Sequence, residues 1–239
     1  MSDPDYLHPF VLPVDDRPIE RHGPVELYPP DAAEPRPAVV IVHGGPSPEA
    51  LRPRPREWPV YRGYPLVAAA RGFVGAAIDH RLYDPAGYPL AAADVAAGIE
   101  VIRADPRVDG DRVALWFFSG GAMLMADWLR TPPPWLRCVA ATYPLMAPFP
   151  GWPVDPRFLP AEAVAGAGAL PIVLSRPGLE DPAIAATVDT FVAAATARAA
   201  RLEIIDVPDG RHGFDHLDHT DQSRAAVERA LTLVLAELS

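Results

Sequence analysis

The chain has little cysteine, no lysine and no long apolar run. Cys138 is the one cysteine among 239 residues, so an internal disulfide cannot form. No stretch of 18 uninterrupted apolar residues is present, which argues against a membrane-spanning helix. All 21 basic residues are arginine and face 31 acidic ones, and the net charge of −10 would repel phosphate backbones. A nucleic-acid partner and a membrane are therefore not expected.

What is present is typical of a globular protein, with 49% hydrophobic and 22% charged residues. A chain of this length buries about 70% of its unfolded surface when it folds as one unit, and we expect residues 1–239 to form one domain. The start, Met1 to Tyr6, is acidic and lacks the apolar segment of a secretory signal, which predicts a cytoplasmic protein. Cys138 lies in an apolar run and is expected to be buried and inert.

Apolar runs of strand length alternate with stretches of helical periodicity. The expected strands are residues 38–42, 73–78, 113–118, 138–143, 170–174 and 202–207. The expected helices are residues 65–70, 90–104, 121–130, 182–198 and 222–238. Continuous apolar runs indicate strands that are buried on both faces. The pattern predicts an α/β fold, a doubly wound and mostly parallel sheet with helices on both faces.

Ser119 lies where the strand-like run 113–118 meets Gly120 and Gly121. A sharp turn from a strand into a helix forces the backbone into strained or closely packed conformations, which glycines permit. Such a turn raises a serine hydroxyl above the end of the sheet. Ser119 is therefore the candidate nucleophile.

A serine hydroxyl needs a neighbouring base to attack at neutral pH, and an imidazole suits that task. His212 follows the run 202–207, is flanked by glycines and precedes the last expected helix. His216 and His219 compete for the role, but they lie at or inside the following acidic stretch without flanking glycines. His212 is the predicted base.

A carboxylate must then orient the imidazole. Glu180 and Asp181 both follow the run 170–174, and Asp209 is a more distant candidate. The position of these residues alone leaves Glu180 and Asp181 both open.

Ligand sites of open α/β sheets lie beyond the carboxyl ends of the strands, and His43, Ser119, Glu180 and His212 all fall there. An oxyanion in this place needs hydrogen-bond donors. The backbone amide of Gly120 is one candidate, and the amide of Gly44 or Gly45 is the other. His43 is expected to orient that loop rather than to transfer protons.

The order serine, acid, histidine, with His43-Gly44-Gly45 closing an earlier strand, resembles the α/β-hydrolase superfamily. The resemblance spans nearly the whole chain and is strongest to the dienelactone-hydrolase-like and carboxylesterase-like branches. It implies an α/β-hydrolase fold with a small cap or none. In relatives of the first branch the acid tends to follow a glycine after one intervening residue, which favours Glu180. Phe117 departs from the family's elbow, where a glycine is usual, and implies a wider crossing or a ring turned into the core.

Two proline-rich segments, residues 46–64 and 144–160, are predicted to be semi-rigid loops that shape the site. Aromatic side chains of these loops, together with Phe118, would favour an apolar or aromatic acyl group. The expected substrate-binding residues are Trp58, Tyr61, Phe118, Phe149 and Trp152.

Other polar motifs are interpreted as structural. The run Asp79 to Leu82, which resembles one common in these hydrolases, is expected to hold an arginine that pairs with carboxylates, and Asp94 is taken as a helix carboxylate. His212, Asp215 and His216 are clustered without a second, separated group of ligands. No metal and no cofactor are therefore expected.

The leading hypothesis is a carboxylic ester hydrolase that cleaves a small ester, lactone or thioester through an acyl-enzyme on Ser119. The alternative is a non-hydrolytic protein of the same fold, either a small-molecule binding protein or a tailoring enzyme such as a cyclase, because fold does not fix function. A peptidase is a third hypothesis, but residues 1–239 are not expected to contain the large accessory domain usual in that branch. The expected partner is a small apolar ester-like molecule, and a homodimer is left open.

Overall fold

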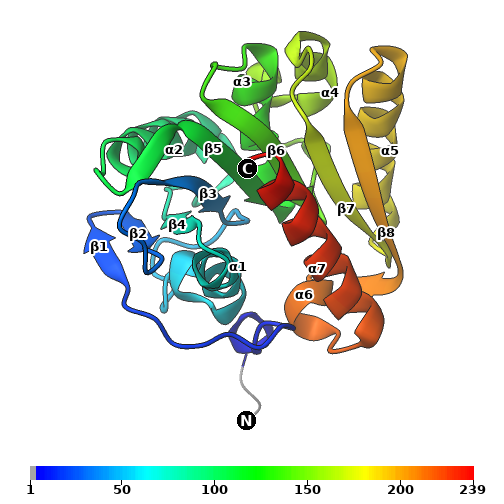
Figure 1. Cartoon of the computed structure of the whole chain (residues 1–239). Helices are drawn as coiled ribbons and strands as arrows, with labels where there is room; N and C mark the ends of the chain where they lie inside the picture. Colours follow the sequence, from blue (N-terminus) through cyan, green and yellow to red (C-terminus); the bar gives the residue numbers. More distant parts are fainter. Residues whose placement is uncertain (1–3) are drawn as a thin grey trace.

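One eight-stranded sheet forms the centre of the molecule, in the order β1-β2-β4-β3-β5-β6-β7-β8 (Figure 1). The structure is a computed structural model that describes residues 4–239, so the first three residues of the acidic start lie outside the described residues. The strands are β1 Glu20–His22, β2 Val25–Tyr28, β3 Arg36–Val42, β4 Val74–Ile78, β5 Val108–Phe118, β6 Leu136–Thr142, β7 Ile172–Leu179 and β8 Leu202–Arg211. Only the pairs β1–β2 and β2–β4 are antiparallel, which confirms the mostly parallel sheet.

Helices cover both faces of the sheet, as predicted (Figure 1). The α-helices are α1 Pro59–Ala70, α2 Tyr88–Arg103, α3 Met125–Arg130, α4 Pro160–Ala163, α5 Pro182–Ala197, α6 Phe214–Leu217 and α7 Asp221–Ala236. The short 3₁₀ turns are η1 Asp5–Leu7, η2 Pro55–Glu57, η3 Pro85–Gly87, η4 Ser119–Leu124, η5 Pro156–Phe158 and η6 Val164–Gly166. Helices α1 and α7 pack on one face, and α2, α3 and α5 pack on the other. Among residues 4–239, no helix combines the length and the apolar character needed to cross a bilayer.

The last residues of β5 show how the sheet separates its two cores. Successive side chains of a strand point to opposite faces, so Phe117 packs with α2 and α3 while Trp116 and Phe118 pack with α1 and α7. Phe117 is fully buried and lies beside Val42 of β3 and Ala141 of β6. The residue that replaces the usual glycine therefore turns its ring into the core.

Helix α1 begins at Pro59, six residues before the expected start at residue 65. The segment 46–64 is therefore not all loop. Proline is tolerated in the first helical turn, where its missing N–H would have no partner. Pro65 lies inside the helix, and its backbone packs so closely over Gly75 of β4 that a side chain at Gly75 would overlap the Pro65 carbonyl.

The remaining differences from the expected elements are at short segments. The antiparallel strands β1 and β2 span three and four residues and have no counterpart among the expected strands. The expected helix 121–130 is a 3₁₀ turn, η4, followed by the short helix α3. The proline-rich segment 144–160 contains η5 and leads into α4.

Candidate active site

The carboxyl ends of the parallel strands bring the candidate residues together. His43 follows β3, Ser119 follows β5, Glu180 follows β7 and His212 follows β8. These four strands lie within one sheet with β5 near its middle. The four residues thus lie at the same edge of the sheet, as predicted from the sequence.

Ser119 occupies a strained turn. Its φ of 48° lies in the left-handed region, where a side chain costs roughly 1–2 kcal/mol, and η4 begins at this residue. The next two residues must be glycine for a packing reason. A side chain on Gly120 would overlap the carbonyl of Gly45, and one on Gly121 would overlap the carbonyl of His43. The loop after β3 therefore lies directly on the elbow.

Ser119, His212 and Glu180 form a continuous chain of hydrogen bonds. The Ser119 Oγ atom lies 2.8 Å from His212 Nε2, and His212 Nδ1 lies 2.7 Å from Glu180 Oε2. The Glu180 side chain is only 4% exposed, and its other oxygen accepts the Asp181 backbone N–H at 2.8 Å. With Nδ1–H donated to the carboxylate, Nε2 is the ring nitrogen that can accept the serine proton.

Asp181 has a different place, although it is the next residue along the chain. It is the N-cap of α5, and its carboxylate accepts the Ala183 backbone N–H at 2.7 Å. Asp209, the distant candidate, pairs with Gln222. Of the candidate acids, the structure brings Glu180 to His212.

A cavity of about 250 Å³ opens over this chain of groups. Ser119 and His212 line it together with Gly44 and Gly45, and Trp58 and Tyr61 form an aromatic wall. Trp58 and Tyr61 are stacked on each other at 5.7 Å between ring centroids. The two aromatic residues predicted from the segment 46–64 are thus at the candidate site.

Three other residues expected to bind substrate do not line this cavity. The alternation of β5 buries Phe118 beneath it, where its ring forms a T-shaped pair with the Tyr61 ring at 5.3 Å between centroids. Phe149 and Trp152 pack against each other at 5.2 Å and against the core that contains α2 and α5. These two side chains therefore have a packing role, and their contact with substrate stays a prediction.

In the loop after β3, one of the backbone amides expected to face an oxyanion already has a hydrogen-bond partner. The Gly44 N–H donates a hydrogen bond to the Tyr61 hydroxyl at 3.0 Å, so this amide is already engaged. Gly120 is the second residue of η4, where the first backbone N–H groups have no partner within the turn. The Gly120 amide therefore stays a predicted oxyanion donor.

His43 anchors this loop from behind. The ring is 2% exposed, its Nδ1 lies 2.6 Å from the Gly44 carbonyl, and its Nε2 lies 3.3 Å from Asp79. Arg54 donates to the other oxygen of Asp79 at 3.0 Å. Burial opposes ionisation of Asp79, but His43 and Arg54 outweigh it and lower the pKa of this carboxyl to about 2. In the same region, Arg81 pairs with Asp94 of α2 at 2.6 Å.

A buried carboxylate that the sequence suggested only as a metal ligand lies under the site. Asp215 is fully buried and accepts the hydroxyls of Tyr64 at 2.9 Å and Tyr143 at 3.0 Å, and His216 Nδ1 lies 2.9 Å away. The Tyr143 ring in turn packs against His212 at 4.9 Å. Nothing in the sequence connects Asp215 to tyrosines so far away along the chain. Within the described part of the chain, no three His, Cys, Asp or Glu side chains form a group that could hold a metal ion.

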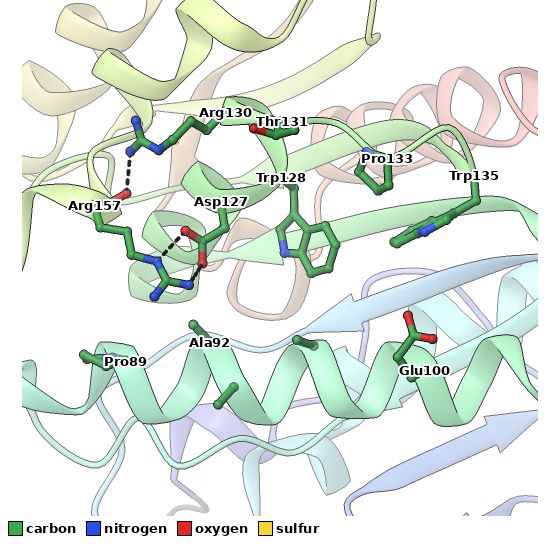
Figure 2. A pocket seen from close by; sticks show the side chains of 12 residues that line it. Pro89, Ala92, Glu100, Asp127, Trp128, Arg130, Thr131, Pro133, Trp135 and Arg157 are labelled. Atoms are coloured by element: carbon green, nitrogen blue, oxygen red, sulfur yellow. Dashed lines mark hydrogen bonds and ion pairs between the residues drawn. The ribbon is translucent and has the colours of Figure 1, made fainter.

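A larger cavity of about 640 Å³ lies between α2 and the segment that contains α3 (Figure 2). Trp128 and Trp135 form part of its wall, and Asp127 holds Arg157 through two hydrogen bonds of 2.6 and 2.7 Å. Among the described residues that line it there is no serine, cysteine or histidine. The groups needed for nucleophilic chemistry are at the smaller cavity.

Comparisons with known proteins find the likeness in structure rather than in sequence. No protein-family model matches the chain. No curated protein matches it either. Among solved structures, a bacterial heroin esterase is 19% identical with a TM-score of 0.73, over 90% of this chain and 79% of that one. Esterase Est22 is 17% identical with a TM-score of 0.69, over 89% and 76% of the two chains. Esterase 2 of Thermogutta terrifontis, phosphonylated by sarin, is 18% identical with a TM-score of 0.67, over 87% and 86%.

Proposed function

The chain has the α/β-hydrolase fold, and on that premise we propose that it is a serine hydrolase that cleaves a small carboxylic ester, lactone or thioester. Ser119 is the nucleophile, His212 the base and Glu180 the carboxylate that orients the base. The observation that carries the proposal is the unbroken chain of hydrogen bonds, 2.8 Å from Ser119 to His212 and 2.7 Å from His212 to Glu180. The dienelactone-hydrolase-like branch stays a prediction of the sequence.

The first half of the reaction forms an acyl-enzyme. The Ser119 Oγ attacks the substrate carbonyl carbon while His212 Nε2 takes the hydroxyl proton. The carbonyl electron pair moves onto oxygen, and the Gly120 amide donates to that oxyanion. When the carbonyl re-forms, the bond to the leaving oxygen or sulfur breaks, and His212 returns the proton to the leaving group.

Water completes the cycle in the same geometry. His212 removes a proton from a water molecule, the resulting hydroxide adds to the acyl carbon, and Ser119 leaves with the proton from His212. The Glu180 carboxylate is almost excluded from solvent, so its negative charge stabilises the imidazolium that forms in both halves. The products are the acid and the alcohol or thiol.

The size and the lining of the cavity indicate what kind of substrate it can hold. At about 250 Å³ it is smaller than the roughly 300–1,000 Å³ of sites for drug-sized ligands. The aromatic wall of Trp58 and Tyr61 suits a short or planar apolar acyl group. The proposed substrates are therefore small, apolar esters rather than long-chain lipids or peptides.

The test is covalent labelling with a fluorophosphonate probe together with hydrolysis of p-nitrophenyl acetate. Wild type should be labelled and active, and Ser119→Ala should lose labelling and at least about 10³-fold in kcat. Ser223→Ala, which removes a buried serine of α7, is the matched control and should be labelled like wild type. A folded wild type that neither labels nor hydrolyses would contradict the proposal and favour a non-hydrolytic protein of this fold.

A further inference from the structure

The hydroxyl of Tyr61 is held rigidly at the edge of the nucleophile's cavity. Tyr61 is the third residue of α1 and is 5% exposed. Its ring stacks on Trp58 and makes a T-shaped contact with Phe118, at centroid distances of 5.7 and 5.3 Å. Such packing leaves the phenol few alternative rotamers, so the hydroxyl has a defined position.

This hydroxyl accepts a hydrogen bond, but the described residues offer no acceptor for its own proton. The Gly44 N–H donates to the Tyr61 oxygen at 3.0 Å. Among residues 4–239, that is the hydrogen bond the hydroxyl makes, so its single O–H is uncommitted. Burial raises the pKa of Tyr61 above its ordinary value, and the phenol therefore keeps its proton at neutral and mildly alkaline pH.

The uncommitted O–H and the nucleophile lie against the same side of Gly44. A methyl group built on Gly44 would be 3.0 Å from Ser119 Cβ and 3.1 Å from the Tyr61 oxygen. The absence of a side chain at this residue keeps open the space between the serine and the phenol. Both residues line the cavity in which the substrate carbonyl must sit.

We propose that the Tyr61 hydroxyl is a catalytic hydrogen-bond donor to the oxyanion, acting together with the Gly120 amide. This inference rests on the proposed serine-hydrolase function. It adds a second hydrogen-bond donor to the oxyanion, which the proposed function did not assign. The Gly44 amide then acts through Tyr61, because a hydroxyl that accepts a hydrogen bond becomes a better donor. The expected role of Gly44 changes accordingly, from direct contact with the oxyanion to polarisation of the phenol.

The chemistry requires no net proton transfer from Tyr61. In the ground state the O–H faces the carbonyl oxygen, and in the tetrahedral intermediate it donates to the oxyanion. The hydrogen bond strengthens as charge develops, because charged acceptors form stronger bonds than neutral ones. The contribution is therefore expected in kcat rather than in KM.

The experiment compares wild type with Tyr61→Phe, which removes the hydroxyl and keeps the ring. Hydrolysis of p-nitrophenyl acetate should lose about 10²- to 10³-fold in kcat with KM changed little. The inhibition constant of a trifluoromethyl ketone, which forms a tetrahedral adduct with the serine, should rise by a similar factor. Tyr28→Phe is the matched control, since it removes a buried phenol that donates to Glu26 and does not line the cavity, and it should keep the wild-type kcat.

A second substitution separates chemistry from structure. Trifluorotyrosine at position 61 keeps the hydroxyl but ionises at lower pH, and a phenolate cannot donate. We expect a new loss of kcat at alkaline pH in that variant, which a packing role would not produce.

Each outcome decides the proposal. Wild-type kcat and inhibition in Tyr61→Phe would overturn it and return the role to the Gly45 amide, and a change confined to KM would make Tyr61 only a wall of the site. If Tyr61→Phe does not fold, an unchanged alkaline limb in the trifluorotyrosine protein would overturn it instead. A wild type that neither hydrolyses the ester nor reacts with a fluorophosphonate would overturn the serine-hydrolase function and this inference together.

Discussion

At the scale of single residues, two adjacent carboxylates show how position in the fold separates roles that the sequence leaves open. Glu180 and Asp181 are both acidic and both follow β7. The Glu180 side chain is nearly buried and contacts His212, while the Asp181 side chain caps the first turn of α5. One side chain can orient the imidazole and the other can satisfy a free amide of the helix.

The pair gives a prediction with its own control. Glu180→Gln should lower kcat by about 10²- to 10⁴-fold, because the amide cannot stabilise the imidazolium or fix its tautomer. Asp181→Asn should keep kcat near wild type, since asparagine also caps a helix well. The measurement is hydrolysis of p-nitrophenyl acetate by the two variants. Equal and mild losses in both would show that neither carboxylate acts on His212.

The same residues show what the sequence could predict about the site. Ser119 and His212 were found because glycines and strand ends mark their turns. Asp215 and the bond from Gly44 to Tyr61 could not be found, because each joins distant segments through side-chain directions that spacing does not encode. Phe118 was misplaced for a related reason. The alternation of β5 decides which face receives each ring, and a continuous apolar run hides that alternation.

At the scale of elements, long buried strands and periodic helices were predictable and short polar ones were not. Residues 138–141 of β6 are all apolar, whereas β1 is the polar triplet Glu20–His22 and becomes a strand only by pairing with β2. The start of α1 was misjudged because prolines usually end helices. Here Pro59 lies in the first turn, and the helix continues through Pro65, whose backbone lies directly on Gly75 of β4.

The junction of β5 and η4 gives the prediction at this scale. In Gly121→Ala the new methyl group would overlap the His43 carbonyl, so either the loop after β3 or the elbow must move. We expect a destabilisation of about 1–3 kcal/mol. The melting temperature should then fall by roughly 2–4 °C per kcal/mol. Activity should fall as well, because the shift displaces Ser119 from His212.

Gly151→Ala is the comparison for this variant. Gly151 has a φ of 85° and open space around it, so the substitution there carries backbone strain without a collision. Thermal unfolding and ester hydrolysis measured on both variants separate the effect of backbone strain from the effect of the steric collision. If Gly121→Ala kept wild-type activity while Gly151→Ala lost it, the packing of the loop on the elbow would not be what positions the serine.

At the scale of the whole molecule, one partly buried network of charged and polar side chains joins three segments around the site. Asp79 follows β4, His43 follows β3, and Arg54 belongs to the proline-rich segment 46–64. Because His43 also contacts the Gly44 carbonyl, the network holds the loop on which the elbow rests. Its charge state therefore couples the stability of the fold to pH.

The sign of that coupling follows from Asp79. Its carboxyl has a pKa of about 2 in the folded protein, below the ordinary value of 3.8, because His43 and Arg54 outweigh the effect of burial. A group with a lowered folded pKa contributes stability above its unfolded pKa and loses that contribution as the pH falls through its folded pKa. The contribution of Asp79 is therefore complete at neutral pH and disappears between about pH 4 and pH 2.

Asp79→Asn tests this coupling, since it removes the charge and keeps the shape. We expect the variant to be less stable at pH 7 by about 1–3 kcal/mol, as is common when a buried pair loses one partner. The difference from wild type should shrink once the pH falls below 4, because the carboxyl of the unfolded chain then takes up a proton while the folded one, with a pKa of about 2, still holds its charge. Urea denaturation at several pH values between 7 and 3 measures both quantities, and Asp31→Asn, at an exposed carboxyl, serves as control. A stability difference that stays constant across this range would show that the Asp79 charge does not stabilise the loop, and that His43 is held by packing alone.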